Sequence, residues 1–291
     1  MKTENQKRFH KIVSFVLAAV MMVSVFSVAI PQKAEAAAPS FKGSGKDSVK
    51  ITDDNCYGIS KKTTVIKFKS NVTGYITLTF SKASNIYNTA GFFTFCDNKK
   101  KALGKTDEYF NTVSDKPYQK IRTYGVKKGS TYYIKVKSFG GVKISSSVVS
   151  VKNNAGNKRT NAKSLGKNKT VKGVIIAGSK AADWYKVKLT KKQILNFYFS
   201  AKTNGAVLKS DNYIYCQNGI KFTICKSNGQ PLISGKDNYD MAHLLNPSDK
   251  DSYFIRDKKT NQISGLYPGT YYIKVEPYNK TSSGLYTIKW K

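Results

Sequence analysis

The sequence predicts an all-β protein that contains two tandem copies of one small domain. A strand occurs twice, because residues 129–136 (GSTYYIKV) reappear as residues 269–275 (GTYYIKV). Two further repeats precede it in the same order, at 74–81 and 193–200 and at 93–96 and 222–225. The offset grows from 119 residues (80 to 199) to 129 (96 to 225) and 139 (132 to 271), as expected when the second copy has longer loops. The 19 tyrosines and 15 phenylalanines also favour strands over helices.

The repeated strand alternates with the two-residue period of a half-buried β-strand. One face carries Tyr132, Ile134 and Val136 in the first copy and Tyr271, Ile273 and Val275 in the second. The other face carries Tyr133 and Lys135 in the first copy and Tyr272 and Lys274 in the second. We expect the first face to be buried and Lys274 to be exposed. The repeats also predict equivalent positions for Phe80 and Phe199, Cys96 and Cys225, and Tyr132 and Tyr271.

Residues 1–36 are predicted to be a signal peptide. Four basic residues precede an apolar run over residues 12–30, and Ala34 and Ala36 form a small-residue cleavage site. The alternative is a membrane anchor, since the run approaches the ~20 residues that cross a bilayer. The basic head and the cleavage site favour export and are typical of a Gram-positive bacterium. We therefore expect a secreted protein, extracellular or associated with the cell wall, with no membrane span after cleavage.

The composition is strongly basic. The chain has 50 Lys and Arg residues against 17 Asp and Glu residues, which gives a formal net charge of +33. Such a charge concentrates anionic polymers such as teichoic acids and acidic polysaccharides near the protein. Only four of the basic residues are arginines, the type that contacts bases in bidentate fashion, so specific recognition of nucleic acid is not expected. The alternative is a lysine coat that serves solubility alone.

The first domain is predicted to span residues 42–152. Its expected strands lie at 65–68, 75–80, 91–96, 131–137 and 142–151. The first two are expected to pair across a turn at 71–74. Residues 97–120 form a polar segment with no clear period, and the polar, turn-rich residues 153–158 are the expected linker.

The second domain is predicted to span residues 160–291. Its motifs begin at Asn161, Val171, Asp183, Ile220, Gly269 and Gly284, in that order. This order resembles the bacterial pre-peptidase C-terminal (PPC) domain, a relative of the collagen-binding domains of clostridial collagenases. The resemblance covers most of the second domain. The first domain lacks the Asp-Trp-Tyr motif of residues 183–185 and resembles the family only through the repeat.

The resemblance implies a jelly-roll-like β-sandwich that is not itself catalytic. Such domains usually accompany secreted peptidases and other hydrolases, where they are thought to bind matrix or polysaccharide or to assist secretion. No catalytic partner is recognisable in this sequence. Some relatives bind calcium near the N-terminal edge of the domain, but here that edge, residues 158–161, is basic. We therefore do not transfer the calcium site to this chain.

Export permits disulfides between the cysteines that follow the signal peptide. These are Cys56, Cys96, Cys216 and Cys225. They allow three pairings, of which one bridge in each domain is the simplest. If Asn218 and Gly219 formed a hairpin turn, Cys216 and Cys225 would lie roughly 13 Å apart, beyond the ~7 Å Cα separation of a disulfide. We therefore expect these two to be unbridged. No zinc site is expected, since no Cys-x-x-Cys pair or nearby histidine occurs.

No catalytic or metal site is predicted. His243 is the single histidine after the signal peptide and has Asp240 nearby, but no Gly-x-Ser-x-Gly motif accompanies them. The acidic residues that glycoside hydrolysis requires are few and lie mostly in loops beside lysines. Asp240, Asp249 and Asp251 supply oxygen ligands, but their spacing is not that of a calcium loop. We expect no cofactor and no enzyme activity.

The candidate ligand-binding residues are aromatic and lysine side chains that the alternation turns away from the core. They are Tyr133, Lys135, Tyr272, Lys274, Tyr278 and Trp184. Flat amphipathic rings stack on sugars or extended chains and keep a polar edge in water. The alternative is that the two strand tyrosines are ordinary cross-strand partners and that Trp184, as the PPC resemblance suggests, is a core residue.

We therefore expect a non-catalytic binding protein for a cell-wall or extracellular polymer, such as a polysaccharide, a teichoic acid or a matrix protein. Two alternatives are a structural or secretion-assisting protein with no specific ligand and an uncharacterised hydrolase. Aligned exposed aromatics favour the first function, and a featureless basic surface favours the second. A pocket that gathers His243 with a serine or with two carboxylates favours the third.

Overall fold

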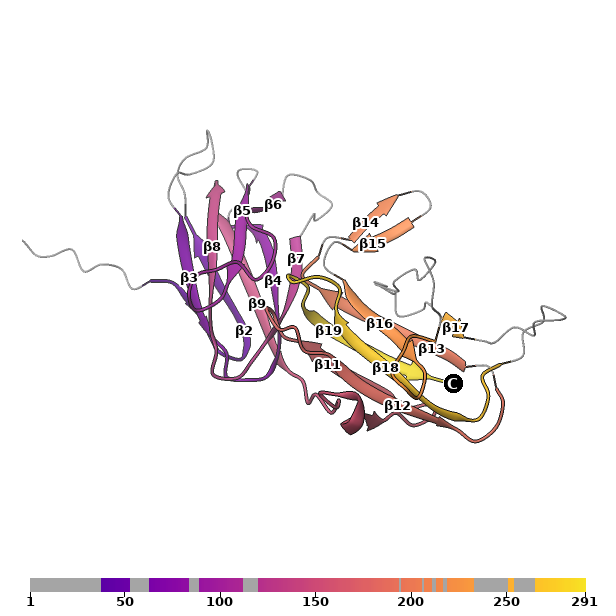
Figure 1. Ribbon diagram of the computed structural model, residues 1–291. Coiled ribbons are helices and arrows are strands. Elements are labelled where there is room, and N and C mark those ends of the chain that lie inside the picture. The colour runs from indigo at the N-terminus through magenta and orange to yellow at the C-terminus, as the bar shows by residue number, and fades with distance from the viewer. Residues whose placement is uncertain are drawn as a thin grey trace, which may run out of the picture. The chain divides into compact units, whose positions relative to one another are not determined.

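The computed structural model describes residues 38–52, 63–83, 89–111, 120–193, 195–205, 207–210, 213–216, 219–232, 251–253 and 265–291. These residues form two β-sandwiches, each with two sheets around its own hydrophobic core (Figure 1). The predicted signal peptide lies outside the described residues. Within the described ranges, no helix is long and apolar enough to cross a membrane.

The first sandwich packs a five-stranded sheet against a four-stranded sheet. The five-stranded sheet, here the β8 sheet, has the order β1 (Ser40–Phe41), β3 (Thr64–Lys69), β8 (Thr131–Phe139), β5 (Ala90–Cys96) and β6 (Glu108–Asn111). The four-stranded β9 sheet has the order β2 (Gly45–Ile51), β9 (Val142–Ser150), β4 (Gly74–Lys82) and β7 (Lys120–Val126). Aromatic rings join the two layers, since the ring centroids of Phe80 on β4 and Phe93 on β5 lie 4.4 Å apart.

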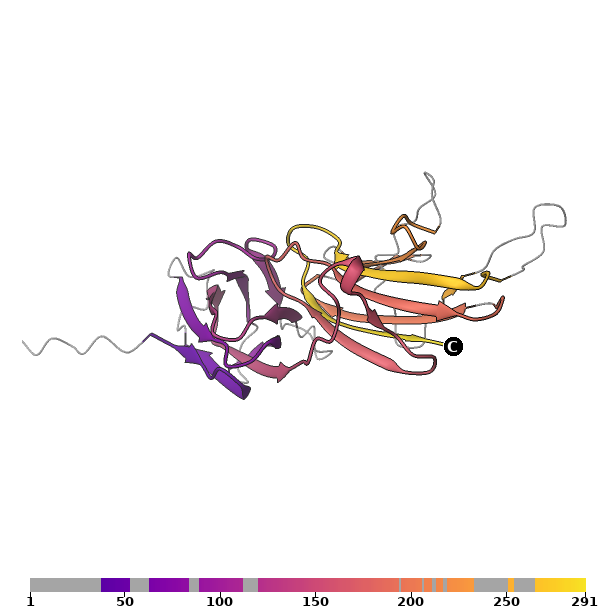
Figure 2. The ribbon, with the colours of Figure 1, turned by 60° about the horizontal axis from the view of Figure 1, so that its bottom comes forward.

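The second sandwich packs two four-stranded sheets, which Figure 2 shows as two layers. The β18 sheet has the order β10 (Lys163–Ser164), β12 (Asp183–Leu189), β18 (Gly269–Pro277) and β16 (Ile220–Cys225). The β19 sheet has the order β11 (Thr170–Ile175), β19 (Gly284–Trp290), β13 (Leu195–Thr203) and β17 (Asp251–Tyr253). A short 3-10 helix η1 (Arg159–Asn161) precedes β10, and β14 (Val207–Ser210) pairs with β15 (Tyr213–Cys216).

The predicted repeat is confirmed by both strand order and register. The order β1-β3-β8-β5 matches β10-β12-β18-β16, and the order β2-β9-β4-β7 matches β11-β19-β13-β17. Cys96 pairs with Tyr133 as Cys225 pairs with Tyr272, and Phe80 pairs with Ile144 as Phe199 pairs with Ile288. The three predicted equivalences therefore hold, and the chain has an all-β fold of two tandem sandwiches.

The predicted hairpin between 65–68 and 75–80 is wrong. The two strands form, as β3 and β4, but they belong to different sheets, because β3 pairs with β1 and β8 whereas β4 pairs with β7 and β9. The backbone of Ser70 at the end of β3 is bonded to Ser130 and Gly129, at the start of β8. The turn at 71–74 therefore crosses from one layer of the sandwich to the other.

Several strands were absent from the sequence prediction. β1 and β2 precede the first expected strand, and β6 lies inside the segment 97–120 that showed no period. β7 begins at the end of the same segment. These strands are short or lie at sheet edges, where one face contributes little to the core and the alternation is weak.

The burial predicted for the repeated strand is confirmed in the first copy and partly in the second. Tyr132, Ile134 and Val136 are buried, as are Ile273 and Val275. Tyr271 is half-buried instead, because its hydroxyl reaches outward to the carbonyl oxygen of Tyr267 at 3.1 Å. Lys274 is half-buried and not exposed, because its amine pairs with the carboxylate of Glu276.

The expected linker is partly built into the second sandwich. Gly156 and Trp184 exchange two backbone hydrogen bonds of 3.0 and 2.8 Å, which adds a short bridge beside β12. The side-chain amide of Asn153 also donates to the carboxylate of Asp183 at 2.9 Å. Residues 153–156 are thus held against the strand that carries Trp184.

Candidate functional site

The predicted ligand-binding residues occupy matching outer faces of the two sandwiches. On the β8 sheet, Lys67, Tyr133 and Cys96 lie side by side on three adjacent strands. On the β18 sheet, Lys186, Tyr272 and Cys225 form the equivalent row. The next row holds Val65, Lys135 and Thr94 in the first sandwich and Trp184, Lys274 and Thr223 in the second. The structure therefore brings Tyr272, Lys274 and Trp184 together, and Tyr133 with Lys135.

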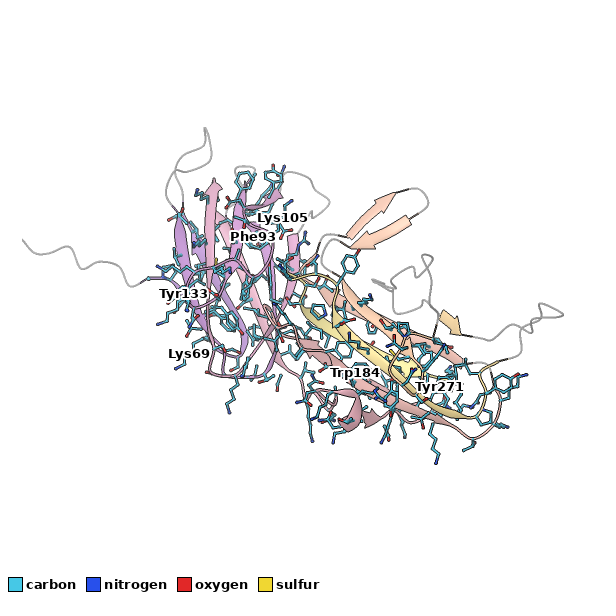
Figure 3. All side chains as sticks on the ribbon, in the orientation of Figure 1. Lys69, Phe93, Lys105, Tyr133, Trp184 and Tyr271 are labelled. Carbon is cyan, nitrogen blue, oxygen red and sulfur yellow. The ribbon has the colours of Figure 1, made fainter. Side chains whose placement is uncertain are left out.

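The second sandwich has a cluster of two aromatic rings and three charged groups on this face. The rings of Trp184 and Tyr272 meet edge to face at a centroid distance of 6.5 Å. The guanidinium of Arg159 lies 5.5 Å from the centre of the Tyr272 ring, and the amine of Lys274 lies 5.9 Å from that of Trp184. The ion pair with Glu276 orients Lys274. Trp184 is half-buried on the outer face and is not among the core residues, so its assignment to the core is wrong (Figure 3).

The equivalent face of the first sandwich has one ring where the second has two. Val65 occupies the position of Trp184. The amine of Lys100 lies 5.7 Å from the centre of the Tyr133 ring, and the amine of Lys135 donates to the carbonyl oxygen of Lys100 at 3.2 Å. Next to Tyr133, a groove of about 420 Å³ is lined by Thr94, Cys96, Lys100, Asp107, Lys135, Lys137 and neighbouring residues.

Tyr278 is exposed but does not belong to the ring cluster. It follows the last residue of β18 and lies six residues beyond Tyr272, which corresponds to about 20 Å at the rise of a strand. Its side chain is 48% exposed. The structure therefore does not bring this predicted ligand residue together with Trp184.

Cys96 and Cys225 are free thiols buried under equivalent loops. Burial raises the pKa of both thiols above the usual value, and for Cys225 to about 11, although Lys135 and Lys274 oppose this effect. Thiols of this kind are protonated near neutral pH and react slowly. The expectation that Cys225 is unbridged is confirmed, but its premise is wrong, because β15 pairs with β14 and not with β16. Cys56 lies outside the described residues, as does the side chain of Cys216.

Behind the ring cluster, the half-buried carboxylate of Asp183 accepts hydrogen bonds from one tyrosine and one side-chain amide, those of Tyr286 and Asn153. The hydroxyl of Tyr286 donates to Asp183 at 2.6 Å, and Tyr185 and Tyr286 share a hydroxyl–hydroxyl bond of 3.0 Å. Burial raises the pKa of Asp183 above its usual value, while the bonds from Tyr286 and Asn153 lower it. This network fixes the start of β12 and therefore the position of Trp184, which follows Asp183.

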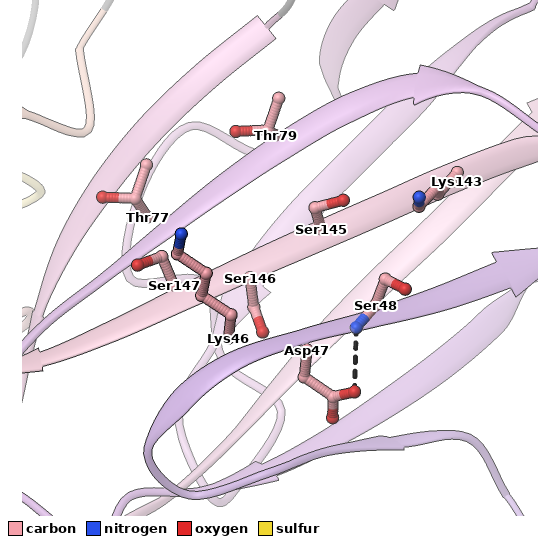
Figure 4. A pocket seen from close by; sticks show the side chains of 9 residues that line it. All are labelled: Lys46, Asp47, Ser48, Thr77, Thr79, Lys143, Ser145, Ser146 and Ser147. Atoms are coloured by element: carbon pink, nitrogen blue, oxygen red, sulfur yellow. Dashed lines mark hydrogen bonds between the residues drawn. The ribbon is translucent and has the colours of Figure 1, made fainter.

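A second candidate face, which the sequence analysis missed, lies on the outside of the β9 sheet (Figure 4). Residues that pair across neighbouring strands form three rows on this face. The first row holds Lys46, Ser147, Thr77 and Thr123. The second row holds Ser48, Ser145, Thr79 and Ile121, and the third holds Lys50, Lys143 and Ser81. We call these residues the hydroxyl face. They border a shallow groove of about 420 Å³. The sequence contains a pattern that predicts this face, because hydroxyl residues alternate with core residues over 75–81.

No catalytic or metal site is evident in the part of the chain that the structure describes. Within it, no group of three His, Cys, Asp or Glu side chains lies close enough to hold a metal ion. His243, Asp240 and Asp249 lie outside the described residues, as does the side chain of Asp251. The hydrolase alternative, which depends on His243, therefore stays a hypothesis.

Comparison with known proteins gives distant structural similarity only. No family model matches the chain, and no curated protein matches it. Among solved structures, tripeptidyl peptidase 2 is 12% identical with a TM-score of 0.25, and the match covers 84% of this chain and 22% of that one. The CUB1-EGF-CUB2 domain of human MASP-1/3 is 10% identical with a TM-score of 0.21, covering 85% of this chain and 100% of that one. The corresponding domains of rat MASP-1 are 10% identical with a TM-score of 0.24, covering 86% and 99%.

Proposed function

We propose that this chain is a secreted, non-catalytic binding protein for anionic polymers of the cell wall or the extracellular matrix. Its main support is the repetition of a lysine–tyrosine row, Lys67 with Tyr133 and Lys186 with Tyr272, on the outer faces of both sandwiches. Two equivalent faces on one chain let it hold a repeating polymer at two points, which raises the apparent affinity without new contacts.

The second sandwich contributes the stronger face in this proposal. The Trp184 and Tyr272 rings offer apolar surface for a sugar ring or an extended chain, and Arg159 and Lys274 offer positive charge beside them. The net charge of +33 adds attraction to any anionic polymer at low salt. Residues 1–36 support export, and the order of motifs from Asn161 to Gly284 supports membership of the second sandwich in the PPC family.

The experiment is sedimentation of the purified protein with cell walls, collagen and polysaccharides over a range of salt concentrations. Charge alone predicts that binding disappears at 1 M salt, where the screening length is about 3 Å. The proposal predicts that part of the binding survives and falls about tenfold in the Trp184→Ala, Tyr272→Ala double variant. Tyr198→Ala is the matched control, since Tyr198 is a half-buried ring beside a lysine on a different face, the outside of the β19 sheet.

The structural or secretion-assisting role is the competing proposal. It is supported by the wide spread of lysines along the chain and by the absence of a third ring in the Trp184 cluster among the described residues. It predicts that high salt abolishes binding completely. It also predicts that the Trp184→Ala, Tyr272→Ala double variant binds as well as the parent. Either result would remove the aromatic faces from the binding mechanism.

A further inference from the structure

The hydroxyl face of the first sandwich has a composition that the fold does not require. The equivalent positions on the second sandwich hold Thr170, Lys289 and Tyr198 where the first has Ser48, Ser145 and Thr79. The second sandwich therefore has a long side chain, Lys289 or Tyr198, at two of these three positions, whereas Thr170 is short, as are Thr287 and Ser200 in the neighbouring row. In the first sandwich, short hydroxyl side chains leave this face flat and accessible.

Several of these hydroxyls are available to a ligand. Thr77 and Thr123 share a bond of 3.2 Å, and Ser81 donates to the carbonyl oxygen of Lys143 at 3.3 Å. Within the described ranges, the hydroxyls of Thr79, Ser145 and Ser147 make no hydrogen bond to protein. A hydroxyl both donates and accepts, so an array of them matches the hydroxyls of a polyol.

The charged side chains of the three rows are all lysines, and one acidic residue, Asp47, also lines the groove. Lys46, Lys50 and Lys143 lie in the first and third rows, on either side of the middle hydroxyl row. Asp47 alternates to the other side of β2 from these lysines, and its carboxylate accepts hydrogen bonds from the backbone N–H groups of Lys42 at 2.7 Å and of Ser48 at 2.8 Å; Figure 4 draws the bond from Ser48. An anionic group placed over the face therefore meets lysines and no carboxylate of these three rows.

The three rows lack an aromatic ring, and the nearest ring of β4 on this face, Tyr75, lies one row beyond Thr77, opposite Val149 and Gly125. Sugar rings and nucleobases are usually held by stacking on a flat side chain, and this face offers none within its rows. An acyclic chain needs no such platform. The combination of free hydroxyls, flanking lysines and no ring fits a chain of polyols linked by phosphodiesters better than it fits a polysaccharide or a nucleic acid.

We propose that the hydroxyl face binds a linear polyol-phosphate polymer, with the phosphates on Lys46 and Lys143 and the polyol hydroxyls on Thr79 and Ser145. This inference rests on the proposed function and names the polymer class for a face separate from the Trp184 cluster. The polymer crosses the rows, because these contacts lie in three successive rows: Lys46 in the first, Ser145 and Thr79 in the second and Lys143 in the third.

The test measures binding of the full chain to purified polyglycerol phosphate, inorganic polyphosphate, polygalacturonate and dextran at fixed salt. The Thr79→Val, Ser145→Ala variant removes two hydroxyls and keeps every charge. We expect it to bind polyglycerol phosphate about tenfold more weakly and to bind inorganic polyphosphate like the parent. We expect Lys46→Gln, Lys143→Gln to weaken binding to both phosphate polymers. Thermal unfolding of each variant checks that it is folded.

A charge-matched control is Lys172→Gln, Lys202→Gln on the outside of the β19 sheet, where both lysines are exposed. The proposal predicts that this control binds better than the Lys46, Lys143 variant. The proposal is overturned if the Lys46, Lys143 variant and the Lys172, Lys202 control lose the same affinity for polyglycerol phosphate. It is also overturned if the Thr79, Ser145 variant binds polyglycerol phosphate like the parent, or if the parent binds polygalacturonate more tightly than polyglycerol phosphate. A parent that binds cell walls but not polyglycerol phosphate overturns this inference alone, whereas a parent that binds no wall or matrix polymer overturns the proposed function.

Discussion

Removing one oxygen atom, with Tyr286→Phe, tests the buried network beneath the ring cluster. The hydroxyl of Tyr286 donates to the carboxylate of Asp183 at 2.6 Å and also bonds to the hydroxyl of Tyr185. A hydrogen bond to a charged group contributes about 1.5–3 kcal/mol, and a neutral one about 0.5–1.5 kcal/mol. Tyr185→Phe breaks only the neutral bond and is the matched control. We expect Tyr286→Phe to lower the free energy of unfolding at pH 7 by about 1.5–3 kcal/mol more than the control does.

The pH dependence of this difference follows from the pKa of Asp183. Burial raises that pKa, so the native state holds the proton to higher pH than the unfolded chain does. The contribution of protonated Asp183 to the free energy of unfolding is fully present below the pKa of the unfolded chain, near 3.8. It is lost as the pH rises through the pKa of Asp183 in the folded protein. Without the Tyr286 donor the folded pKa rises further, so the variant loses more stability at pH 7 than at pH 3.

Urea unfolding followed by tyrosine and tryptophan fluorescence between pH 3 and pH 7 measures both effects. At pH 3, where Asp183 is protonated, the extra loss of unfolding free energy in Tyr286→Phe relative to Tyr185→Phe should shrink to about 0.5–1.5 kcal/mol, the contribution of a neutral hydrogen bond. Equal losses for the two tyrosine variants at pH 7, or an excess that does not change on acidification, would refute the argument that Tyr286 stabilises a buried charge.

Three further changes test the packing. Ile273→Ala empties a fully buried position of β18 and should cost about 2–5 kcal/mol in a denaturant melt, whereas a cost well under 1 kcal/mol would contradict the register. Glu108→Ala leaves the buried guanidinium of Arg122 without its carboxylate and should cost about 3–5 kcal/mol, measured in the same way. Gly173→Ala places a methyl group 2.1 Å from the ring of Tyr286, so we expect a loss of about 1–3 kcal/mol, and a stability equal to that of the parent would show that the ring moves freely.

The positions of most strands were predictable from the sequence, but their partners were not. The alternation in 75–80 shows that one face of this strand is buried. The same alternation would occur in either sheet, so it does not tell whether the strand belongs to the β8 sheet or to the β9 sheet. The turn at 71–74 suggested a local hairpin because a polar turn between two strands usually closes one. The choice between sheets depends on β8 and β9, which lie far along the chain and whose pairing no local pattern encodes.

The site was predictable as a set of residue types but not as a cluster. The alternation placed Tyr272 and Lys274 on an outer face, and the structure agrees. The contact between Trp184 and Tyr272 depends on the register of β12 against β18, and the approach of Arg159 depends on η1, which lies outside both strands. The core position of Trp184, which the PPC resemblance suggested as the alternative to ligand binding, is wrong, because Asp183 and the buried Tyr185 face inward and the tryptophan between them faces outward.

The two sandwiches have diverged on their surfaces while keeping one architecture. The strand registers match, yet Trp184 replaces Val65 on one outer face and Tyr198 replaces Thr79 on the other. Each replacement exchanges a small side chain for a ring, and both rings are in the second sandwich. The proposed stacking on Trp184 and Tyr272 therefore belongs to the second sandwich, and the proposed hydrogen bonding to hydroxyls belongs to the first. A polymer that presents both sugar rings and polyol phosphates would engage the two sandwiches through different chemistry, so mutations in one should not compensate for mutations in the other, and their effects on binding free energy should add.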